Sequence, residues 1–179
     1  MMSVKFDAER GGFFPYDSAG NPLWFYGIFQ SEALFYLHVC YDDFFGSPVI
    51  FKYRVKEARD ACLGAHFSQT FSGSSPANTN DDTGAGFNLS PEQLNATSYP
   101  FTPNLEYANY PLGTRGQRDA EDFLTSQGGC VRATLTQQKR GIDLIAMGVE
   151  YEVKSRGEGQ RYRALSIQTH ERNDNRRIS

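Results

Sequence analysis

Cys130 has the surroundings most like those of a cysteine nucleophile. It follows Gly128 and Gly129 in the run SQGGCV, and two glycines give the backbone before the thiol wide conformational freedom. His170, on a late predicted strand, could approach this thiol as a general base, which is the pairing that thiol enzymes use. The other interpretation is structural, with the glycines ending a helix and Cys130 starting a strand. No signature motif of a cysteine enzyme is present, so Cys130 and His170 are kept as an enzymatic alternative.

The histidines and the other cysteines make a poor metal site. His38 and Cys40 would share one face of a predicted strand, and Cys62 and His66 are four residues apart on a predicted helix. However, the sequence contains neither a CxxC nor an HxxxH pair, and it lacks a phosphate-binding loop and a GxSxG motif. Because cysteines outside disulfides are among the most buried residues, Cys40 and Cys62 are expected in the core. We therefore predict no metal and no cofactor.

A group of aromatic side chains suggests binding without chemistry. Several lie in a proline-rich segment, and two stand beside the first predicted turn. The predicted binding residues are Trp24, Tyr26, Tyr99, Phe101, Tyr107 and Tyr110. Tyrosine and tryptophan are enriched where proteins contact other proteins. Alternatively, these rings fill the edge of the core, where most large apolar side chains lie.

The composition is that of a globular chain and disfavours several classes of function. The 179 residues are 39% hydrophobic and 14% aromatic, with a net charge of −3, whereas a nucleic-acid binder is usually basic. No run approaches the ~20 apolar residues of a membrane helix, and the first residues lack the apolar centre of a secretory signal. Three widely spaced cysteines fit reduced thiols. We expect a cytoplasmic protein, or a component of a particle assembled inside the cell, with no membrane partner.

The N-terminal third is predicted to be an antiparallel meander. A short strand begins near residues 3–6, and the apolar runs 11–16 and 23–29 flank the turn DSAGN. Asp17 can accept backbone hydrogen bonds in this turn, and Gly20 supplies a positive φ. The sequence therefore predicts a hairpin here.

Two more strands and a helix follow. Residues 33–41 are almost continuously apolar, which is typical of a strand buried on both faces, whereas residues 49–55 alternate as a half-exposed strand does. Apolar residues at helical spacing then predict a short amphipathic helix over 55–66, with Gly64 weakening its end.

Residues 68–113 are predicted to form one long polar loop. Ser90 and Gln93 have the spacing of a capping box around Pro91, which predicts the start of a helix. The prolines farther along the segment exclude a central strand there. A loop of this length in a compact domain is usually functional or mobile, so it is the favoured contact element.

The C-terminal part is predicted to be a helix followed by three strands. Thr114 would cap the helix and Gly128 would end it. The alternation then predicts strands over 130–135 and 142–153, and a phase change near Gly148 suggests a β-bulge in the second. The last predicted strand returns as a hairpin that places acids opposite bases on one exposed face, namely Glu150 and Glu152 opposite Arg161 and Arg163.

These elements predict an α+β fold with one domain over residues 1–179. Its twisted antiparallel sheet has about six strands, with two or three short helices. Its parts are a meander (3–55), a helix and long loop (56–113), a helix and strands (114–170) and a tail (171–179). The favoured function is a non-enzymatic interaction or assembly subunit, such as a virion component, a complex subunit or an inhibitor. Its partner is another protein or a second copy. The alternatives are the cysteine enzyme and a small-molecule binder with its pocket between the sheet and the 68–113 loop.

Overall fold

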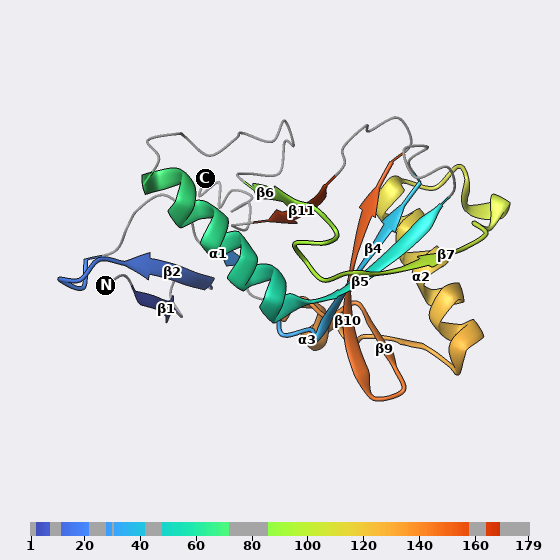
Figure 1. Ribbon diagram of the computed structural model, residues 1–179. Helices are drawn as coiled ribbons and strands as arrows, with labels where there is room; N and C mark the ends of the chain where they lie inside the picture. Colours follow the sequence, from blue (N-terminus) through green and yellow to red (C-terminus); the bar gives the residue numbers. More distant parts are fainter. Residues whose placement is uncertain are drawn as a thin grey trace, which may run out of the picture. The chain divides into compact units, whose positions relative to one another are not determined.

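A computed structural model describes residues 3–7, 12–21, 28–29, 31–41, 48–71, 86–157 and 164–168. The chain divides into two compact units. One comprises Met1–Gln30, Cys62–Asn88 and Ser166–Ser179, and the other Ser31–Ala61 and Leu89–Leu165. We call the second the six-stranded unit, after its largest sheet (Figure 1). The predicted α+β class is confirmed, while the single domain over residues 1–179 stays a prediction.

The six-stranded unit is built on a sheet whose strands come from distant parts of the chain. In spatial order these strands are β7 (Thr97–Pro100), β5 (Val49–Arg54), β4 (Phe35–Cys40), β10 (Val149–Arg156), β9 (Leu144–Ala146) and β8 (Val131–Arg132). Every neighbouring pair is antiparallel except β4 and β10, which run parallel with Phe35 opposite Tyr151. The sheet is therefore mixed, a departure from the expected antiparallel one. No tight turn joins β4 to β10, so no local signal sets their direction.

The two strands predicted around residues 33–55 are confirmed. β4 is buried from Tyr36 to Cys40, and β5 alternates between buried residues and the more exposed Lys52 and Arg54. β7 lies at the edge of the sheet and ends at Pro100, in agreement with the expectation that this proline-rich segment holds no central strand.

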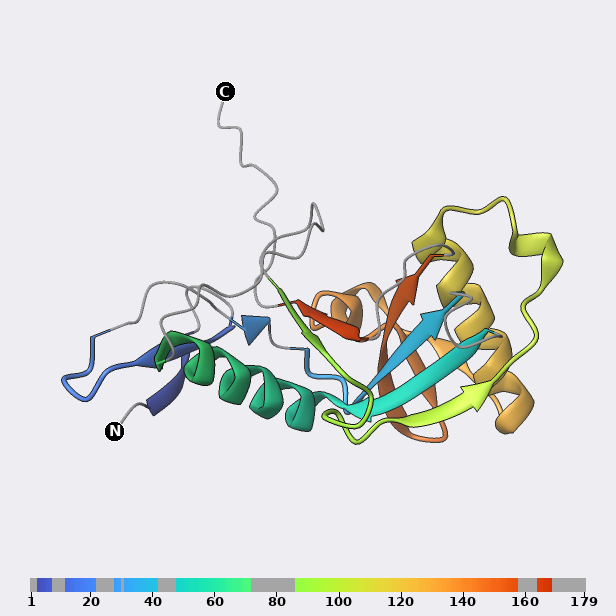
Figure 2. The same cartoon turned by 45° about the horizontal axis from the view of Figure 1, so that its top comes forward.

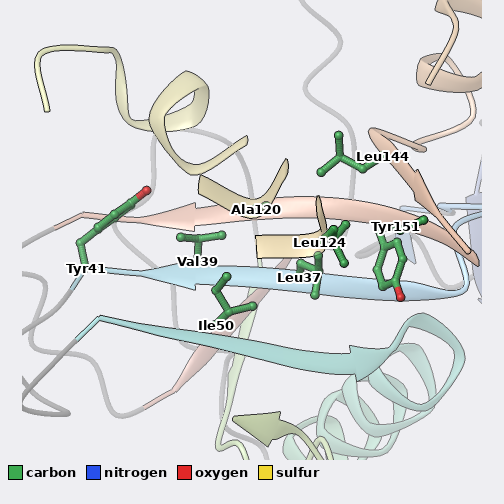
Figure 3. Packing of buried hydrophobic residues seen from close by; sticks show 9 residues of the cluster. Leu37, Val39, Tyr41, Ile50, Ala120, Leu124, Leu144 and Tyr151 are labelled. Atoms are coloured by element: carbon green, nitrogen blue, oxygen red, sulfur yellow. The ribbon is translucent and has the colours of Figure 1, made fainter. Parts of the chain in front are cut away.

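Helix α2 (Leu112–Gln127) covers one face of this sheet (Figure 2). Alternate residues of β4, Leu37 and Val39, lie beside Ala120 and Leu124 of the helix (Figure 3). The rest of this buried cluster comes from the residue that follows β4 and from β5, β9 and β10. Its members are Tyr41, Ile50, Leu144, Ala146 and Tyr151. Burial of these apolar side chains is the main force that holds helix and sheet together.

The limits of α2 agree with the prediction at one end only. Gly128 follows the last helical residue with a φ of 149°, as a helix-ending glycine should. The helix begins at Leu112, after Pro111, so the prediction that Thr114 caps it is wrong. Pro111 occupies the N-cap position with a φ of −52° and a ψ of 143°, and its carbonyl accepts from the Arg115 amide at 2.9 Å, so the first helical hydrogen bond forms before Thr114.

The other unit contains the predicted N-terminal hairpin. Its three strands are antiparallel and pair in the order of the chain, as β1 (Ser3–Asp7), β2 (Gly12–Tyr16) and β3 (Ile28–Phe29). The Asp17 carboxylate accepts hydrogen bonds from the amides of Ala19 and Asn21, and Gly20 has a φ of 84°. The hairpin and its turn are thus confirmed. A single meander is wrong, because β4 and β5 belong to the other sheet.

Helix α1 (Val55–Phe71) is longer than the predicted 55–66, because Gly64 does not end it. Conversely, the helix predicted after Ser90 is a single turn. The capping box forms, with the Ser90 amide donating to the Gln93 side chain at 2.7 Å. Asn95 then takes a φ of 50° and β7 begins at Thr97, so the chain leaves the helical conformation at once.

Two expectations for the chain between Cys130 and Val153 are wrong. The strand after Cys130 covers only Val131–Arg132, because Thr134 caps the short helix α3 (Leu135–Gln138). The phase change near Gly148 is a two-residue hairpin turn in place of a bulge. Met147 and Gly148 both have positive φ, as tight hairpins between β-strands require.

The last described strand does not return to β10. β11 (Leu165–Gln168) pairs with β6 (Gly86–Leu89), a segment inside the predicted long loop. Glu152 is 5% exposed, so it does not lie on an exposed charged face, and Arg161 and Arg163 lie outside the described residues. The alternation correctly predicted a strand in this region, but alternation does not identify the strand with which it pairs.

Within the described part of the chain, no helix is long and apolar enough to cross a membrane.

Candidate interaction surface

Four of the six predicted binding residues lie in the described segment that runs from β7 to the start of α2. They are Tyr99, Phe101, Tyr107 and Tyr110, all in the six-stranded unit. Trp24 and Tyr26 lie outside the described residues. The segment also contains the short 3-10 helix η2 (Leu105–Tyr107), so it is an ordered connection.

Tyr99 and Phe101 attach the start of the segment to the core. Both are half-buried. The ring of Tyr99 lies 5.5 Å from that of Phe123 on α2, and Phe101 meets Tyr41 edge-on at 5.9 Å. Edge-to-face and tilted contacts at these distances are favourable aromatic geometry. These two rings therefore support the segment and leave little surface for a partner.

Tyr107 and Tyr110 form the outer part of the segment. Their rings stack at 5.6 Å with an interplanar angle of 24°, and the Tyr107 hydroxyl donates to Asp122 Oδ2 at 3.0 Å. This hydrogen bond is the main reason why the pKa of Tyr107 is raised. Tyr110 is 44% exposed. The stack fixes the orientation of a ring that still faces solvent.

Asp119 of α2 is the buried anchor beneath the segment. Its carboxylate accepts a hydrogen bond from the Asn104 amide at 3.0 Å and one from the Tyr41 hydroxyl at 2.5 Å. Burial, followed by this hydrogen bond, raises the pKa of Tyr41, so its hydroxyl remains a donor. The Arg115 guanidinium lies 4.0 Å from the centre of the Tyr41 ring. A buried carboxylate with these partners holds the loop backbone at a defined position.

The segment also presents aliphatic side chains that the sequence reasoning missed. Leu105 is 83% exposed at the start of η2, and Leu112 is 38% exposed at the start of α2. We define the 104–112 surface by the side chains of Leu105, Tyr107, Tyr110 and Leu112. The signal was available in PNLEY: Asn104 can cap a short turn, and a leucine inside such a turn has no helical face to bury it.

The described residues give the Cys130 thiol no activating partner. It is partly exposed, and its Sγ lies 3.9 Å from the carbonyl oxygen of Val131. Burial and then the Glu121 carboxylate raise its pKa, whereas a reactive cysteine needs a lowered one. His170 lies outside the described residues, so the pair Cys130–His170 stays a prediction.

Three of the residues considered as metal ligands, His38, Cys40 and Cys62, are packed in the interior, and the side chain of His66 lies outside the described part of the structure. His38 is 3% exposed and its Nδ1 lies 3.2 Å from the Tyr53 hydroxyl, while Cys40 and Cys62 are 1% and 0% exposed. Burial raises the pKa of Cys62 to about 12. Among the residues that the structure describes, no three histidine, cysteine or acidic side chains are grouped as metal ligands would be.

The sequence reasoning also missed a polar face of the sheet. His38 lies on the face opposite to α2, where Glu152 and Arg156 of β10 are each 5% exposed. Burial lowers the pKa of His38 to about 3, with smaller contributions from Arg156 and Lys154, and burial raises the pKa of Glu152. Buried charged groups of this kind require partners, and Lys154 forms an ion pair with Glu152.

Comparison with known protein families, curated proteins and solved structures finds no match for this chain.

Proposed function

We propose that the protein is a non-enzymatic interaction or assembly subunit and that the 104–112 surface contacts its partner. The observation that carries this proposal is the 83% exposure of Leu105 on a turn whose backbone is fixed. A large apolar side chain in solvent is common when it is isolated. Leu105, Tyr110 and Leu112 are three such side chains on one ordered segment, and a group of this kind is typical of a protein contact.

The fixed backbone supports binding through the cost of association. A mobile loop must lose conformational entropy when it binds, and this loss weakens the complex. Here the Asn104 side chain accepts from the Glu106 amide at 3.0 Å, and Asp119 holds the Asn104 amide. The 104–112 surface is therefore ordered before any partner arrives.

The residue types also fit this function. Tyrosine is enriched among the side chains that contribute most to protein–protein affinity, and it loses little rotamer freedom on binding. Tyr110 offers an exposed ring on the same segment as Leu105 and Leu112, while the hydroxyl of Tyr107 is already satisfied by Asp122. This combination gives an apolar centre with no unsatisfied hydroxyl from Tyr107.

Site-specific photo-crosslinking tests the proposal. Benzoylphenylalanine replaces Leu105 in one full-length variant and Leu135 in a control, because Leu135 is 78% exposed but lies on α3. Both variants are irradiated alone and in an extract of the cells that make the protein. We expect a discrete product only from position 105, and unlabelled protein should compete with it. Tyr110→Ala protein should compete at least tenfold less well. Equal products from both positions, or none from position 105, would refute the proposal.

A further inference from the structure

A separate groove of the six-stranded unit is suited to a small ligand. It has a volume of about 660 Å³, which lies within the range of small-molecule sites in proteins. It is bounded by β5 and β7 and by the turn that precedes β7. The lining residues are Val49, Phe51, Pro91, Glu92, Asn95, Ala96 and Ser98. We call it the β5–β7 groove; it shares no residue with the 104–112 surface.

One wall of the groove is a turn with a fixed shape. The Gln93 amide donates to Ser90 Oγ at 3.2 Å, and the Ala96 amide donates to the Pro91 carbonyl at 2.9 Å. Leu94 is 1% exposed and anchors the turn in the core. A wall held in this way exists before a ligand binds, so little ordering opposes binding.

The floor of the groove is apolar with one polar edge. Val49 and Phe51 occupy alternate positions of β5 and therefore share a face of the sheet. Phe51 is 4% exposed, and Ser98 of β7 lies directly opposite it in the strand pairing. An aromatic and aliphatic floor accepts a small apolar group.

Glu92 supplies the charge of the groove. Among the described residues that line the groove, it is the one with an ionisable side chain, and it is exposed. Its carboxylate takes part in none of the ion pairs formed between described residues. A carboxylate at the rim of an apolar groove attracts a cation and repels an anion.

We propose that the β5–β7 groove binds a small organic ammonium ion. The apolar body of the ligand lies on Val49 and Phe51, and its ammonium group points to Glu92. Ser98 and Asn95 offer further hydrogen-bonding groups at the rim. This proposal does not depend on the 104–112 surface, so either one can fail alone.

Titrations of the full-length protein with three matched probes test the ligand class. The probes are 2-phenylethylamine, 2-phenylethanol and phenylacetate, followed by amide chemical shifts in NMR spectra. We expect saturable binding of the amine, with shifts at Val49, Phe51 and Ala96. Because an exposed charge pair contributes little in water, the alcohol should bind roughly two- to fivefold more weakly. Phenylacetate should bind more weakly still. Absence of saturable amine binding at millimolar concentration, or equal binding of amine and anion, would overturn the proposal.

Three variants locate the site. Glu92→Gln should remove the preference for the amine over the alcohol, and Ala96→Trp should fill the groove and abolish binding of both. Glu57→Gln is the matched control, because Glu57 is exposed on α1, pairs with Arg54 and does not line the groove. If Glu92→Gln retained the preference, or Glu57→Gln lost it, the assignment of the charge would be wrong.

Discussion

At the scale of single residues, the 104–112 surface depends on Asp119. This carboxylate is 3% exposed and accepts from both Tyr41 and Asn104. In Asp119→Asn, the amide nitrogen cannot accept, so one buried donor loses its partner. We expect a loss of about 2 kcal/mol in the free energy of unfolding, measured by urea denaturation. Hydrogen exchange at the Asn104 amide should also become faster.

Asp122→Asn is the control for this prediction. Asp122 lies on the same helix and accepts from the Tyr107 hydroxyl, but it is exposed. Water can replace a lost contact there, so its effect should be much smaller. If both substitutions had equal effects, Asp119 would not be the anchor of the segment.

His38 makes the stability of the sheet depend on pH. Its pKa is about 3 in the folded protein, mainly through burial, against about 6.5 in an unfolded chain. The folded state thus binds fewer protons between these values, and stability falls as the pH drops below 6.5. When the pH is lowered from 7 to 5.5, the free energy of unfolding should fall by about 1 kcal/mol more in the wild type than in His38→Gln.

Comparing how the free energy of unfolding changes with pH in the wild type and in His38→Gln separates the contribution of His38 from those of its neighbours. Glu152 has a raised pKa, so its contribution has the opposite sign and falls as the pH rises above its unfolded value. Glu152 is present in both proteins, as are Lys154, Arg156 and the hydroxyl of Tyr53. Urea midpoints at three pH values suffice as the measurement. Parallel pH profiles for the two proteins would mean that His38 does not titrate in this way.

At the scale of elements, α2 approaches β10 through Gly116. A Cβ atom at this position would lie 1.9 Å from Ser155 Oγ and 2.8 Å from Ser155 Cβ. Gly116→Ala should therefore lower the free energy of unfolding by about 1–3 kcal/mol. The same change at an open helical position would raise it by up to about 1 kcal/mol.

Two further variants isolate this contact. Gly113 belongs to the same helix, and a Cβ atom added there would have no neighbouring atom within 4 Å. Gly113→Ala should therefore not destabilise the protein. Adding Ser155→Gly to Gly116→Ala removes the side chain that clashes and should restore most of the stability. Thermal unfolding of the four proteins measures both effects. If the double variant were as unstable as Gly116→Ala, the destabilisation would not arise from the contact with Ser155.

The elements that the sequence predicted best are those with strong local patterns. An apolar run identified β4, alternation identified β5, and Asp17 with Gly20 identified the first turn. The errors arose where long-range pairing decides the structure. The partner of β11 is β6, and neither strand carries a pattern that distinguishes this partner from β10.

The candidate surface was predicted in part for the same physical reason. Aromatic residue types indicated the segment, but the half-burial of Tyr99 depends on its contact with Phe123 of α2, and the orientation of Tyr110 depends on its stack with Tyr107. Leu105 was missed because a leucine in a loop gives no periodic signal, and its only cue was the capping residue Asn104 before it. Asp119 was missed because its role requires Asn104 and Tyr41 to meet in space.

At the scale of the whole molecule, the identity of the partner can be tested through mass in solution. The net charge is only −3, so repulsion between copies is weak at physiological salt. If the partner is a second copy, the mass from light scattering should rise with protein concentration. Leu105→Glu should then weaken self-association at least tenfold, because it places a charge in an apolar contact. Leu135→Glu should change nothing.

A different partner predicts a different pair of results. Wild-type protein and Leu105→Glu would then both remain monomeric at every concentration, while the crosslink from position 105 would appear only in extract. Leu105 is 83% exposed, so its substitution removes no buried contact and should leave the thermal midpoint unchanged. That midpoint is the control that separates lost binding from lost folding. If Leu105→Glu self-associated as strongly as the wild type, the contact between copies would lie outside the 104–112 surface.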